Sequence, residues 1–450
     1  MSEQLQENKM GVMPVGKLLL TMSAPLVASM LFQAFYNIVD SMFVARLGQD
    51  ALNAVSLAFP VQNMEIAFSA GTGVGINAFL SRSLGAKDYD RVNRITNTGI
   101  FLYFVTALVF AAIGLLGAGA YYRFQTENAT IIRYGTAYVR IITGMSFALF
   151  AQMCSERLLQ ATGRTNLAMI PQITGAVINM VLDPILIFGL LGFPRMEVAG
   201  AAAATIIGQS IAAVIGFVLN VRRNPEIRIA GKLIRFDRKI SAGIYKVGVP
   251  SIIVQLGGSI MNFFLNKILI GFSEAATAAL GAYYKIQNFI FMPVIGMNNA
   301  LVPILSYNLG AGKRDRVRQS ARIAVLAAMG IMAVGTLLFE LIPQTLLGLF
   351  TPSEELLRVG TTAFRIIAIH FVAAAFSIVS GSINQALGKP FYSLITALGR
   401  SLFFLLPSAY LLSLTGVLEN VWYSFLIGEV ASIVLCIFFL RKAYKDVGLA

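Results

Sequence analysis

Two aspartates lie within stretches of the sequence that are otherwise apolar. Asp40 follows Asn37 in Asn37-Ile-Val-Asp40, and Asp183 follows Asn179 in Asn179-Met-Val-Leu-Asp183-Pro184. Asn179 and Asp183 are four residues apart, which would place both side chains on one face of a helix. Pro184 cannot donate a backbone hydrogen bond, so a carbonyl oxygen nearby would be left free. The sequence therefore predicts a group of oxygen atoms around Asp40, Asn179 and Asp183.

Oxygen ligands suit a proton or a small hard cation such as sodium, because neither needs sulfur or imidazole. A charged side chain costs roughly 2.5–3.5 kcal/mol to insert near the centre of a membrane helix, so acids at that depth are functional candidates. We predict that Asp40, Asn179 and Asp183 bind a proton or a sodium ion. The alternative is that the two acids cap helices or pair with arginines at the membrane interface.

The composition indicates a multi-pass membrane protein. Of the 450 residues, 57% are hydrophobic and 12% are charged, which leaves too little polar surface to cover a soluble protein of this length. Apolar stretches long enough to cross ~30 Å of hydrocarbon as helices recur along the chain. We predict an all-α fold with twelve spans. They lie near residues 17–45, 52–80, 95–119, 131–156, 167–190, 198–221, 247–271, 276–304, 320–343, 356–385, 391–413 and 418–440.

The two halves of the chain repeat one another at a constant offset of 225 residues. Examples of matching residues are Pro25 with Pro250, Asn37 with Asn262, Ser81 with Ser306, Arg140 with Arg365 and Gly163 with Gly388. Six spans in each half give both halves the same orientation, so we predict two pseudo-symmetric parallel six-helix bundles. The predicted lobes are residues 1–221 and 247–450, joined by a linker at 222–246. Many secondary transporters consist of two such repeats.

The basic residues predict the orientation. The loops at 81–94, 222–246 and 306–322 are rich in Lys and Arg, whereas the alternate loops carry only Arg46, Arg123 and Arg195. We therefore expect the basic loops and both termini to be cytoplasmic, in an inner or plasma membrane. This distribution also accounts for the net charge of +14. The expected partners of these residues are anionic lipid headgroups, not nucleic acid.

The sequence predicts no enzyme and no bound cofactor. It has one histidine, His370, and two cysteines, Cys154 and Cys436, and it lacks the motifs of nucleotide-binding loops, serine hydrolases and zinc proteases. ATP is therefore not expected as a direct energy source. The protein would use either the energy of an ion gradient or no energy source at all.

Pro25 and Pro250 occupy matching positions inside the first span of each half. Proline in a helix interior bends or breaks the helix, so we predict that both residues form gating kinks. The alternative is a static bend. Glu65 lies deep in the second span and is a candidate for substrate contact. In the second half, Lys285 follows Tyr284, and a buried lysine could titrate during transport, although its chain could equally extend to the interface.

The sequence resembles the multidrug and toxic compound extrusion (MATE) family, bacterial type, over essentially its whole length. The motifs that carry the resemblance are Asn37-x-x-Asp40 with Leu47-Gly48, Leu84-Gly85-Ala86, Gln160-Ala161-x-Gly163, and Asn179-x-x-Leu182-Asp183-Pro184 ahead of Gly200-Ala201-Ala202. The resemblance implies an antiporter that expels organic cations in exchange for sodium or protons, through a V-shaped cavity between the lobes. It also implies that Asp40, Asn179 and Asp183 form the cation or proton site, with Thr205 as a further ligand.

One position departs from this pattern. Family branches that bind the coupling ion in the second lobe use a glutamate in the seventh span, where this chain has Gln255. The residues that we predict to line the substrate cavity are Asn37, Glu65, Gln255, Tyr284, Lys285 and Asn288. Acids together with Phe, Tyr and Met would favour a flat lipophilic cation.

Three other functions are considered. The first is a flippase for lipid-linked oligosaccharides. Such flippases usually have more than twelve helices and a more cationic cavity, so the twelve predicted spans and the central acids disfavour this function. The second is an exporter of an endogenous metabolite. The third is a receptor or scaffold without transport activity, which the tandem halves disfavour. We expect the protein to be a monomer.

Overall fold

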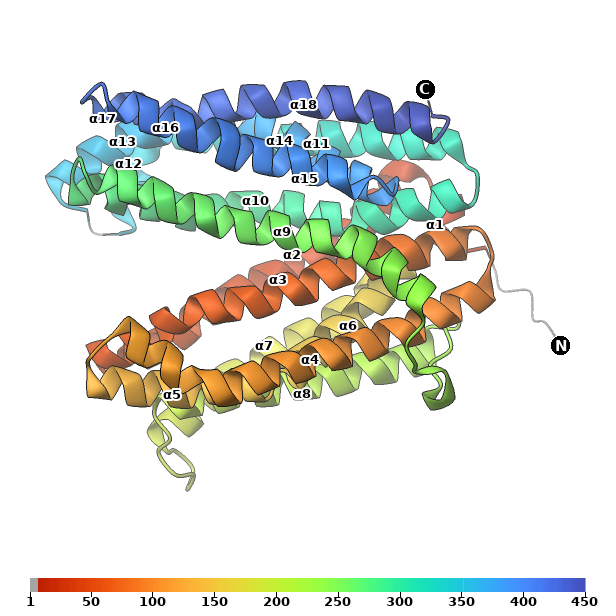
Figure 1. The fold of residues 1–450 in the computed structure, drawn as a ribbon, viewed down its shortest axis with the longest axis horizontal. Helices are drawn as coiled ribbons and strands as arrows, with labels where there is room; N and C mark the ends of the chain where they lie inside the picture. The colour runs from red at the N-terminus through yellow and green to blue at the C-terminus, as the bar shows by residue number, and fades with distance from the viewer. Residues whose placement is uncertain (1–6, 351, 450) are drawn as a thin grey trace. The chain divides into compact units, whose positions relative to one another are not determined.

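A computed structural model describes residues 7–350 and 352–449, and every regular element in this part of the chain is helical (Figure 1). Most helices are long enough to cross a bilayer. The elements are α1 (Lys9–Val12), α2 (Val15–Ala45), α3 (Gln49–Gly85), α4 (Tyr89–Gln125), α5 (Ala129–Gly144), α6 (Phe147–Ala161), α7 (Thr165–Phe188), α8 (Val198–Arg223), η1 (Gly231–Leu233), α9 (Arg238–Leu269), α10 (Glu274–Gly310), α11 (Arg314–Leu341), α12 (Pro343–Gly348), α13 (Glu354–Ala368), α14 (Phe371–Ala386), α15 (Pro390–Leu398), η2 (Gly399–Leu405), α16 (Leu406–Ser413), α17 (Leu418–Trp422) and α18 (Ser424–Asp446).

The helices confirm the prediction of an all-helical membrane protein with many spans. Within the described residues, nine helical segments have the length and apolar composition of a membrane span. Two bent pairs of helices pass the same test when each pair is taken together, with α5 and α6 inclined by 43° and α13 and α14 by 52°. Counting each pair as one span gives eleven.

The remaining predicted span, 52–80, forms α3, which has 37 residues. It is not among the eleven, because polar residues such as Gln62, Asn63 and Glu65 interrupt its apolar sequence. The number of twelve membrane crossings therefore stays a prediction, whereas the helix itself is present.

The chain divides into two compact units. The first comprises the described residues up to Lys9 together with Ala24–Gly248, and the second comprises Met10–Ser23 and the chain from Val249 onward. Of the three divisions between the units, the one at Lys9 falls inside α1, and the other two fall within two residues of a proline. Pro25 lies inside α2, and Pro250 lies inside α9. The first unit thus contains most of α2, the helices α3 to α8 and the start of α9. The assignment of functional lobes to residues 1–221 and 247–450 stays a prediction.

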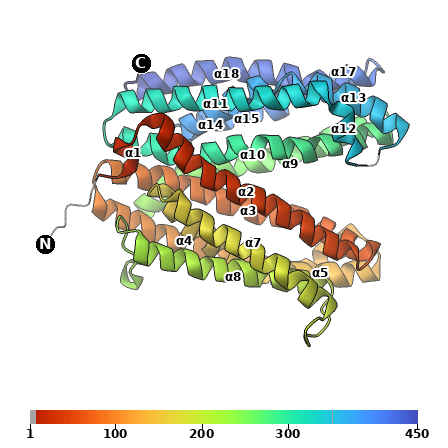
Figure 2. The same cartoon turned by 180° about the vertical axis from the view of Figure 1, so that it is seen from behind.

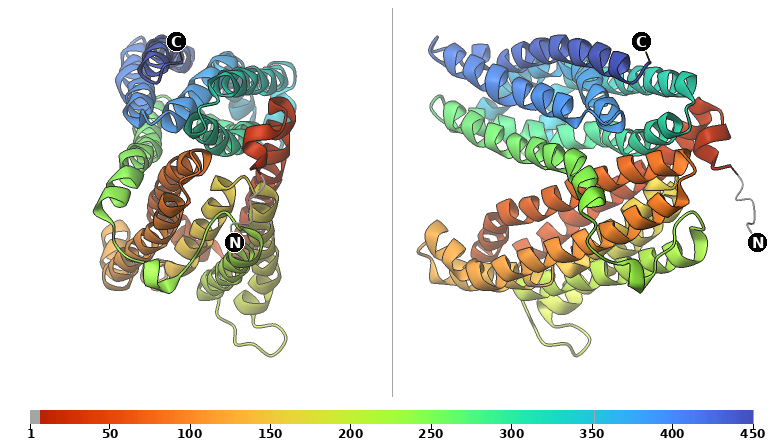
Figure 3. Two further views of the ribbon diagram at one scale, coloured as in Figure 1. Left: turned by 90° about the vertical axis from the view of Figure 1, so that its right-hand side faces the viewer. Right: turned by 45° about the vertical axis from the view of Figure 1, so that its right-hand side comes forward.

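The repeat of the sequence is also present in the structure. Within each unit the long helices run roughly side by side (Figure 3). In the first unit, the Ser81 hydroxyl donates to the Ala161 carbonyl at 2.7 Å. In the second unit, the matching Ser306 hydroxyl donates to the Ala386 carbonyl at 3.3 Å. The same tertiary contact therefore recurs at the offset of 225 residues.

Glycines let two helices of the first unit approach closely. The helices α7 and α8 run side by side (Figure 2). A Cβ atom on Gly208 would lie 2.7 Å from the carbonyl oxygen of Gly175, and one on Gly200 would lie 2.6 Å from the carbonyl oxygen of Leu186. Small residues at such crossings allow backbones to pack against each other inside a membrane. This packing fixes the position of Asn179 on α7 relative to Thr205 on α8.

Candidate functional site

Three helices of the first unit bring the predicted polar cluster together. Asp40 comes from α2, Asn179 and Asp183 from α7, and Thr205 from α8. Asn179 and Asp183 are 2% and 0% exposed. The Asn179 amide nitrogen donates to Oδ2 of Asp183 at 3.1 Å, and its oxygen accepts from the backbone N–H of Thr205 at 3.1 Å. The spacing of four residues on α7 therefore places both side chains as the sequence predicts.

The carboxyl groups of Asp40 and Asp183 hydrogen-bond to each other. Such a bond requires a proton on one of the two groups, since an ionised carboxylate only accepts. The pair therefore has the geometry of a site that holds one proton between two acids. Its occupancy would control the net charge of the cluster.

The cluster also has oxygen atoms available for a cation. Oδ1 of Asp40 and Oδ1 of Asp183 are buried and have no hydrogen-bond partner in the described part of the chain. Buried polar atoms usually have a partner, so these two atoms are candidates for contact with a bound ion or water. Carboxylate, amide and hydroxyl oxygens in one place form a donor set that suits sodium.

Two tyrosines belong to the same neighbourhood and were not among the predicted residues. Tyr36 on α2 and Tyr138 on α5 both interact electrostatically with Asp40. The Gln62 amide donates to the Tyr138 hydroxyl at 3.3 Å. Tyr36 is four residues before Asp40, and this helical spacing could have identified it. Tyr138 lies far from the other members in sequence and offers no such signal.

A small cavity of about 50 Å³, lined by both polar and apolar residues, adjoins the cluster inside the first unit. It is large enough for water, and its lining supplies the polar partners that a buried water needs. Asn179 and Thr205 form part of this lining, as does Glu156, which is 3% exposed and accepts from the Gln152 amide at 2.9 Å. Glu156 is thus a further acid close to the predicted ion site.

The sequence predicts that two other residues of the first unit, Glu65 and Asn37, line a substrate cavity. Glu65 on α3 is 1% exposed and accepts from the Ser146 hydroxyl at 2.5 Å, at the bend between α5 and α6. Asn37 is exposed on α2. Their assignment to a substrate cavity stays a prediction.

The predicted residues of the second unit come from α9 and α10. Gln255 is half-buried on α9. On α10, Tyr284 is half-buried, while Lys285 and Asn288 are exposed. The Lys285 ammonium lies 5.5 Å from the centre of the Phe350 ring, which is within the range of a cation–π contact. Whether these residues contact substrate stays a prediction.

The second unit contains an ion pair between a buried glutamate and a half-buried arginine, which the sequence did not reveal. Glu429 on α18 is 2% exposed and accepts from the Ser377 hydroxyl at 2.5 Å and from Nη1 of Arg400 at 3.3 Å. Arg400 lies in η2, a π-helical turn between α15 and α16. His370 is 7% exposed, and its ring centre lies 5.7 Å from that of Phe425.

The polar cluster has no counterpart in the repeat. At the offset of 225 residues, the positions of Asp40, Asn179, Asp183 and Thr205 are taken by Leu265, Phe404, Ser408 and Val430. The two halves have therefore diverged at this place, and the paired acids belong to the first half alone. An ion that binds carboxylates has its best-supported site in the first unit.

Replacing Gly208 by valine is expected to disturb the cluster through the packing of α8 on α7, because a Cβ atom there would also lie 3.4 Å from the Cβ of Asn179. The added side chain would meet the Gly175 backbone, which cannot move as freely as a side chain. Overpacking of this kind costs about 1–3 kcal/mol. We expect a lower midpoint of thermal unfolding in detergent and weaker binding of the coupling ion. Gly281→Val is the control, because no atom lies within 4 Å of a Cβ there; an equal effect of both variants would contradict close packing as the cause.

Comparisons with known proteins identify the family and the fold. A FAD transporter of Shewanella oneidensis is 26% identical over 402 residues, which cover 88% of each chain. The multidrug export protein MepA of Staphylococcus haemolyticus is 24% identical, covering 94% of this chain and 92% of the relative. A crystal structure of MATE in complex with MaL6 is 26% identical, with a TM-score of 0.91, and covers 98% of this chain and 99% of that one.

The family comparison matches both halves. The model of the family described as MatE matches residues 25–185 and again residues 250–411. Both matches begin at the prolines of the repeat, Pro25 and Pro250. The match extends over more than half of the chain. The chain therefore belongs to the MatE family and is a multi-pass membrane transporter, not an enzyme.

Proposed function

We propose that this transporter is a secondary active multidrug exporter, which expels lipophilic organic cations in exchange for protons or sodium by alternating access. The observation that carries the proposal is the hydrogen-bonded pair of Asp40 and Asp183, held by Asn179 and Thr205 inside the first unit. A relative that is described as a multidrug export protein supports the substrate class.

In the proposed cycle, the outward-facing protein takes up a proton or a sodium ion at Asp40, Asn179 and Asp183. Binding reduces the charge of the cluster, and α2 bends near Pro25, a position where the backbone hydrogen-bond pattern is already interrupted. The organic cation then leaves to the outside. The transporter, now without drug, turns inward and releases the proton or sodium ion. Pro250 in α9 would serve as the matching hinge of the second half.

The number of protons would set the strength of export. Exchange of one proton for one monovalent cation moves no net charge, so only the pH difference contributes, about 1.4 kcal/mol per unit, or tenfold. Exchange of two protons would add the membrane potential, ~2.3 kcal/mol per 100 mV. Two acids in contact permit either stoichiometry, because each can carry a proton.

The orientation follows from the basic loops. We propose that both termini are cytoplasmic in the inner or plasma membrane, where basic residues such as Arg228 and Arg238 of the linker meet anionic headgroups.

Export of an endogenous metabolite is a second candidate function. The observation in its favour is the relative described as a FAD transporter, which matches 88% of the chain, compared with 94% for the multidrug export protein MepA. An anionic metabolite would require basic groups along its path, and Lys267 and Lys285 of the second unit are available for this role. A competition assay with FAD distinguishes the two functions.

Transport into liposomes tests the proposal. Purified protein would be reconstituted, and a fluorescent organic cation would be followed under a pH gradient alone or a sodium gradient alone. We expect one of the two gradients to drive movement of the dye, and this gradient identifies the coupling ion. Movement of FAD but not of the dye would favour the metabolite exporter. No movement under either gradient would contradict coupled export.

A further inference from the structure

Three basic side chains gather at one end of α7 and α8, within the first unit. Lys9 begins α1, Arg164 directly precedes α7, and Arg223 is the last residue of α8. All three line a groove of about 550 Å³. No helix contributes more than one of them, so the fold and not a local run of charge brings them together. Three cations around one groove create an electrostatic preference for an anion.

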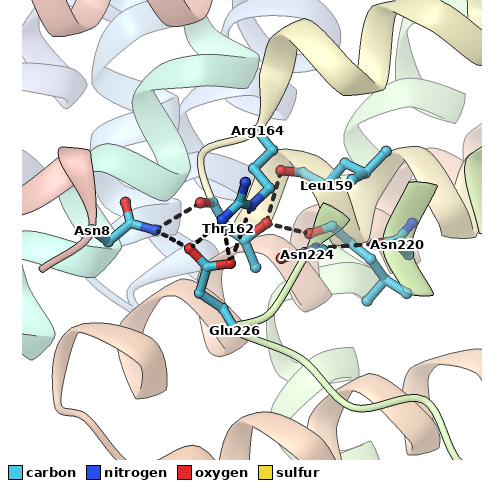
Figure 4. Close-up of polar contacts among 8 residues, drawn as sticks. Asn8, Leu159, Thr162, Arg164, Asn220, Asn224 and Glu226 are labelled. Atoms are coloured by element: carbon cyan, nitrogen blue, oxygen red, sulfur yellow. Dashed lines mark hydrogen bonds and ion pairs between the residues drawn. The ribbon is translucent and has the colours of Figure 1, made fainter. Parts of the chain in front are cut away.

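Glu226, the acid beside the groove, already pairs with Arg164 and accepts a hydrogen bond from Asn8. Nη2 of Arg164 lies 2.9 Å from Oε2 of Glu226, and the Arg164 Nε donates to the same oxygen at 3.1 Å. The Asn8 amide donates to Oε1 of Glu226 at 3.1 Å (Figure 4). Glu226 therefore neutralises one of the three cations and holds Arg164 in a fixed orientation. A net positive charge remains along the groove.

The pKa of Lys9 reflects both its burial and the positive charge of its neighbour Arg164. Burial lowers the pKa of the Lys9 amine below its usual value, and the Arg164 guanidinium lowers it further, while Glu226 opposes both effects. The charged form of Lys9 is thus disfavoured by its surroundings. An anion bound beside Lys9 and Arg164 would reverse this effect, so binding an anion and charging the lysine favour each other.

The other wall of the groove is apolar. Leu167 and Ile170 of α7 and Leu219 of α8 contribute to its lining. An exposed apolar stripe continues from the groove along α7, through Ile170, Val177 and Val181, which are 40%, 42% and 56% exposed. Their spacing of seven and four residues places them on one face of the helix. Because α7 is a membrane span, this stripe leads from the basic end into the hydrocarbon depth.

We propose that this groove binds an anionic phospholipid, with its phosphate among Lys9, Arg164 and Arg223 and an acyl chain along Leu167 and Ile170. A phospholipid is the ligand that combines a negative headgroup with a long apolar chain, and basic pockets at the polar ends of membrane helices suit such headgroups. A soluble anion would use the basic part alone. A bound lipid would also link Lys9 to the ends of α7 and α8 within the first unit.

Lipid titration of the full-length protein, followed by native mass spectrometry, tests this site. The probes are phosphatidylglycerol and phosphatidylcholine. A double variant, Lys9→Gln with Arg223→Gln, leaves the Arg164–Glu226 ion pair in place. We expect it to bind phosphatidylglycerol roughly 30-fold more weakly, from about 1 kcal/mol for each basic residue near the surface. Phosphatidylcholine binding should not change.

The matched control removes two charges from the segment around η1, with Lys232→Gln and Arg235→Gln, which do not line the groove. This control is expected to retain phosphatidylglycerol binding. Glu226→Gln should strengthen it by roughly fivefold, because one opposing charge is lost. If both double variants lose phosphatidylglycerol binding equally, the lipid is attracted by the general positive charge of the surface and not by this groove, and the proposal is wrong.

A further variant tests the acyl contact without changing charge. Ile170→Asn should weaken binding of long-chain phosphatidylglycerol and leave a short-chain analogue unaffected. If inorganic phosphate displaces the lipid completely at equal concentration, the groove binds a free anion and the proposal is wrong. These measurements require no transport, so they remain decisive even if the proposed drug export fails.

Discussion

Asp183→Asn is expected to abolish gradient-driven export while leaving the protein folded in the membrane. Asparagine has nearly the same size as aspartate, and its side-chain oxygen can still accept the hydrogen bond from Asn179. Asparagine cannot, however, gain or lose a proton as a carboxyl group does, and it has no negative charge to balance a bound sodium ion. Substitution therefore removes the ion chemistry of the cluster and retains its packing.

The size of the effect follows from the energetics of coupling. A gradient of one pH unit supports about tenfold accumulation of a monovalent cation when one proton is exchanged. Without a group that binds the ion, the gradient cannot drive the cycle, so the accumulation ratio in liposomes should fall to one. The same loss is expected under a sodium gradient if sodium is the coupling ion.

The control for Asp183→Asn is Asp90→Asn, which makes the same chemical change at an exposed position in the first turn of α4. This control should transport normally. Asp40→Asn should resemble Asp183→Asn, because its carboxyl group is the other half of the hydrogen-bonded pair. Retained export in Asp183→Asn, with normal amounts of protein in the membrane, would rule out the assignment of the ion site.

The predicted cluster could be found from sequence because its signal is local. Asn179 and Asp183 are separated by about one helical turn and surrounded by apolar residues. The helix period therefore predicts that they share a face, and the cost of burying a charge marks Asp183 as a functional candidate. Thr205 came from the resemblance to the MATE family, since its place beside Asn179 depends on how α7 packs on α8. The repeat was equally accessible, because the same residues recur at a fixed offset.

Features that depend on tertiary packing could not be predicted in this way. The single predicted span at 131–156 is a pair of helices with a break near Met145 and Ser146, where the serine hydroxyl instead reaches Glu65 of another helix. Likewise, the span at 391–413 contains the π-helical turn η2. No residue pattern along the chain specifies these breaks, because the groups that stabilise them come from distant segments.

Arg400→Met is expected to cause the largest loss of stability among the variants of the second unit. Glu429 would remain in its buried position, 2% exposed, without its cationic partner. Removing one member of a buried ion pair costs about 3–5 kcal/mol, and we expect the lower end because the Arg400 side chain is 31% exposed. For a unit of this size, about 3 kcal/mol lowers the unfolding midpoint by roughly 6–12 °C.

A double-mutant cycle separates the ion pair from simple packing. Arg400→Met together with Glu429→Gln should be more stable than Arg400→Met alone, because glutamine is uncharged and can retain the hydrogen bond from Ser377. Thermal unfolding of the four proteins in one detergent measures this difference. If the double variant is as unstable as the sum of the single variants, the two side chains are not coupled.

The outcome also bears on the asymmetry of the two halves. Arg400 and Glu429 match Gly175 and Ala204 of the first unit, next to the residues that hold Asp183. In the first unit, small residues at these positions leave the acids of the cluster without a basic partner from α7 or α8. In the second, the arginine neutralises the glutamate. A stable Arg400–Glu429 pair would explain how the second unit buries Glu429 beside a basic partner. Asp40 and Asp183 of the first unit have no such partner from α7 or α8, and we propose that an exchangeable ion takes its place.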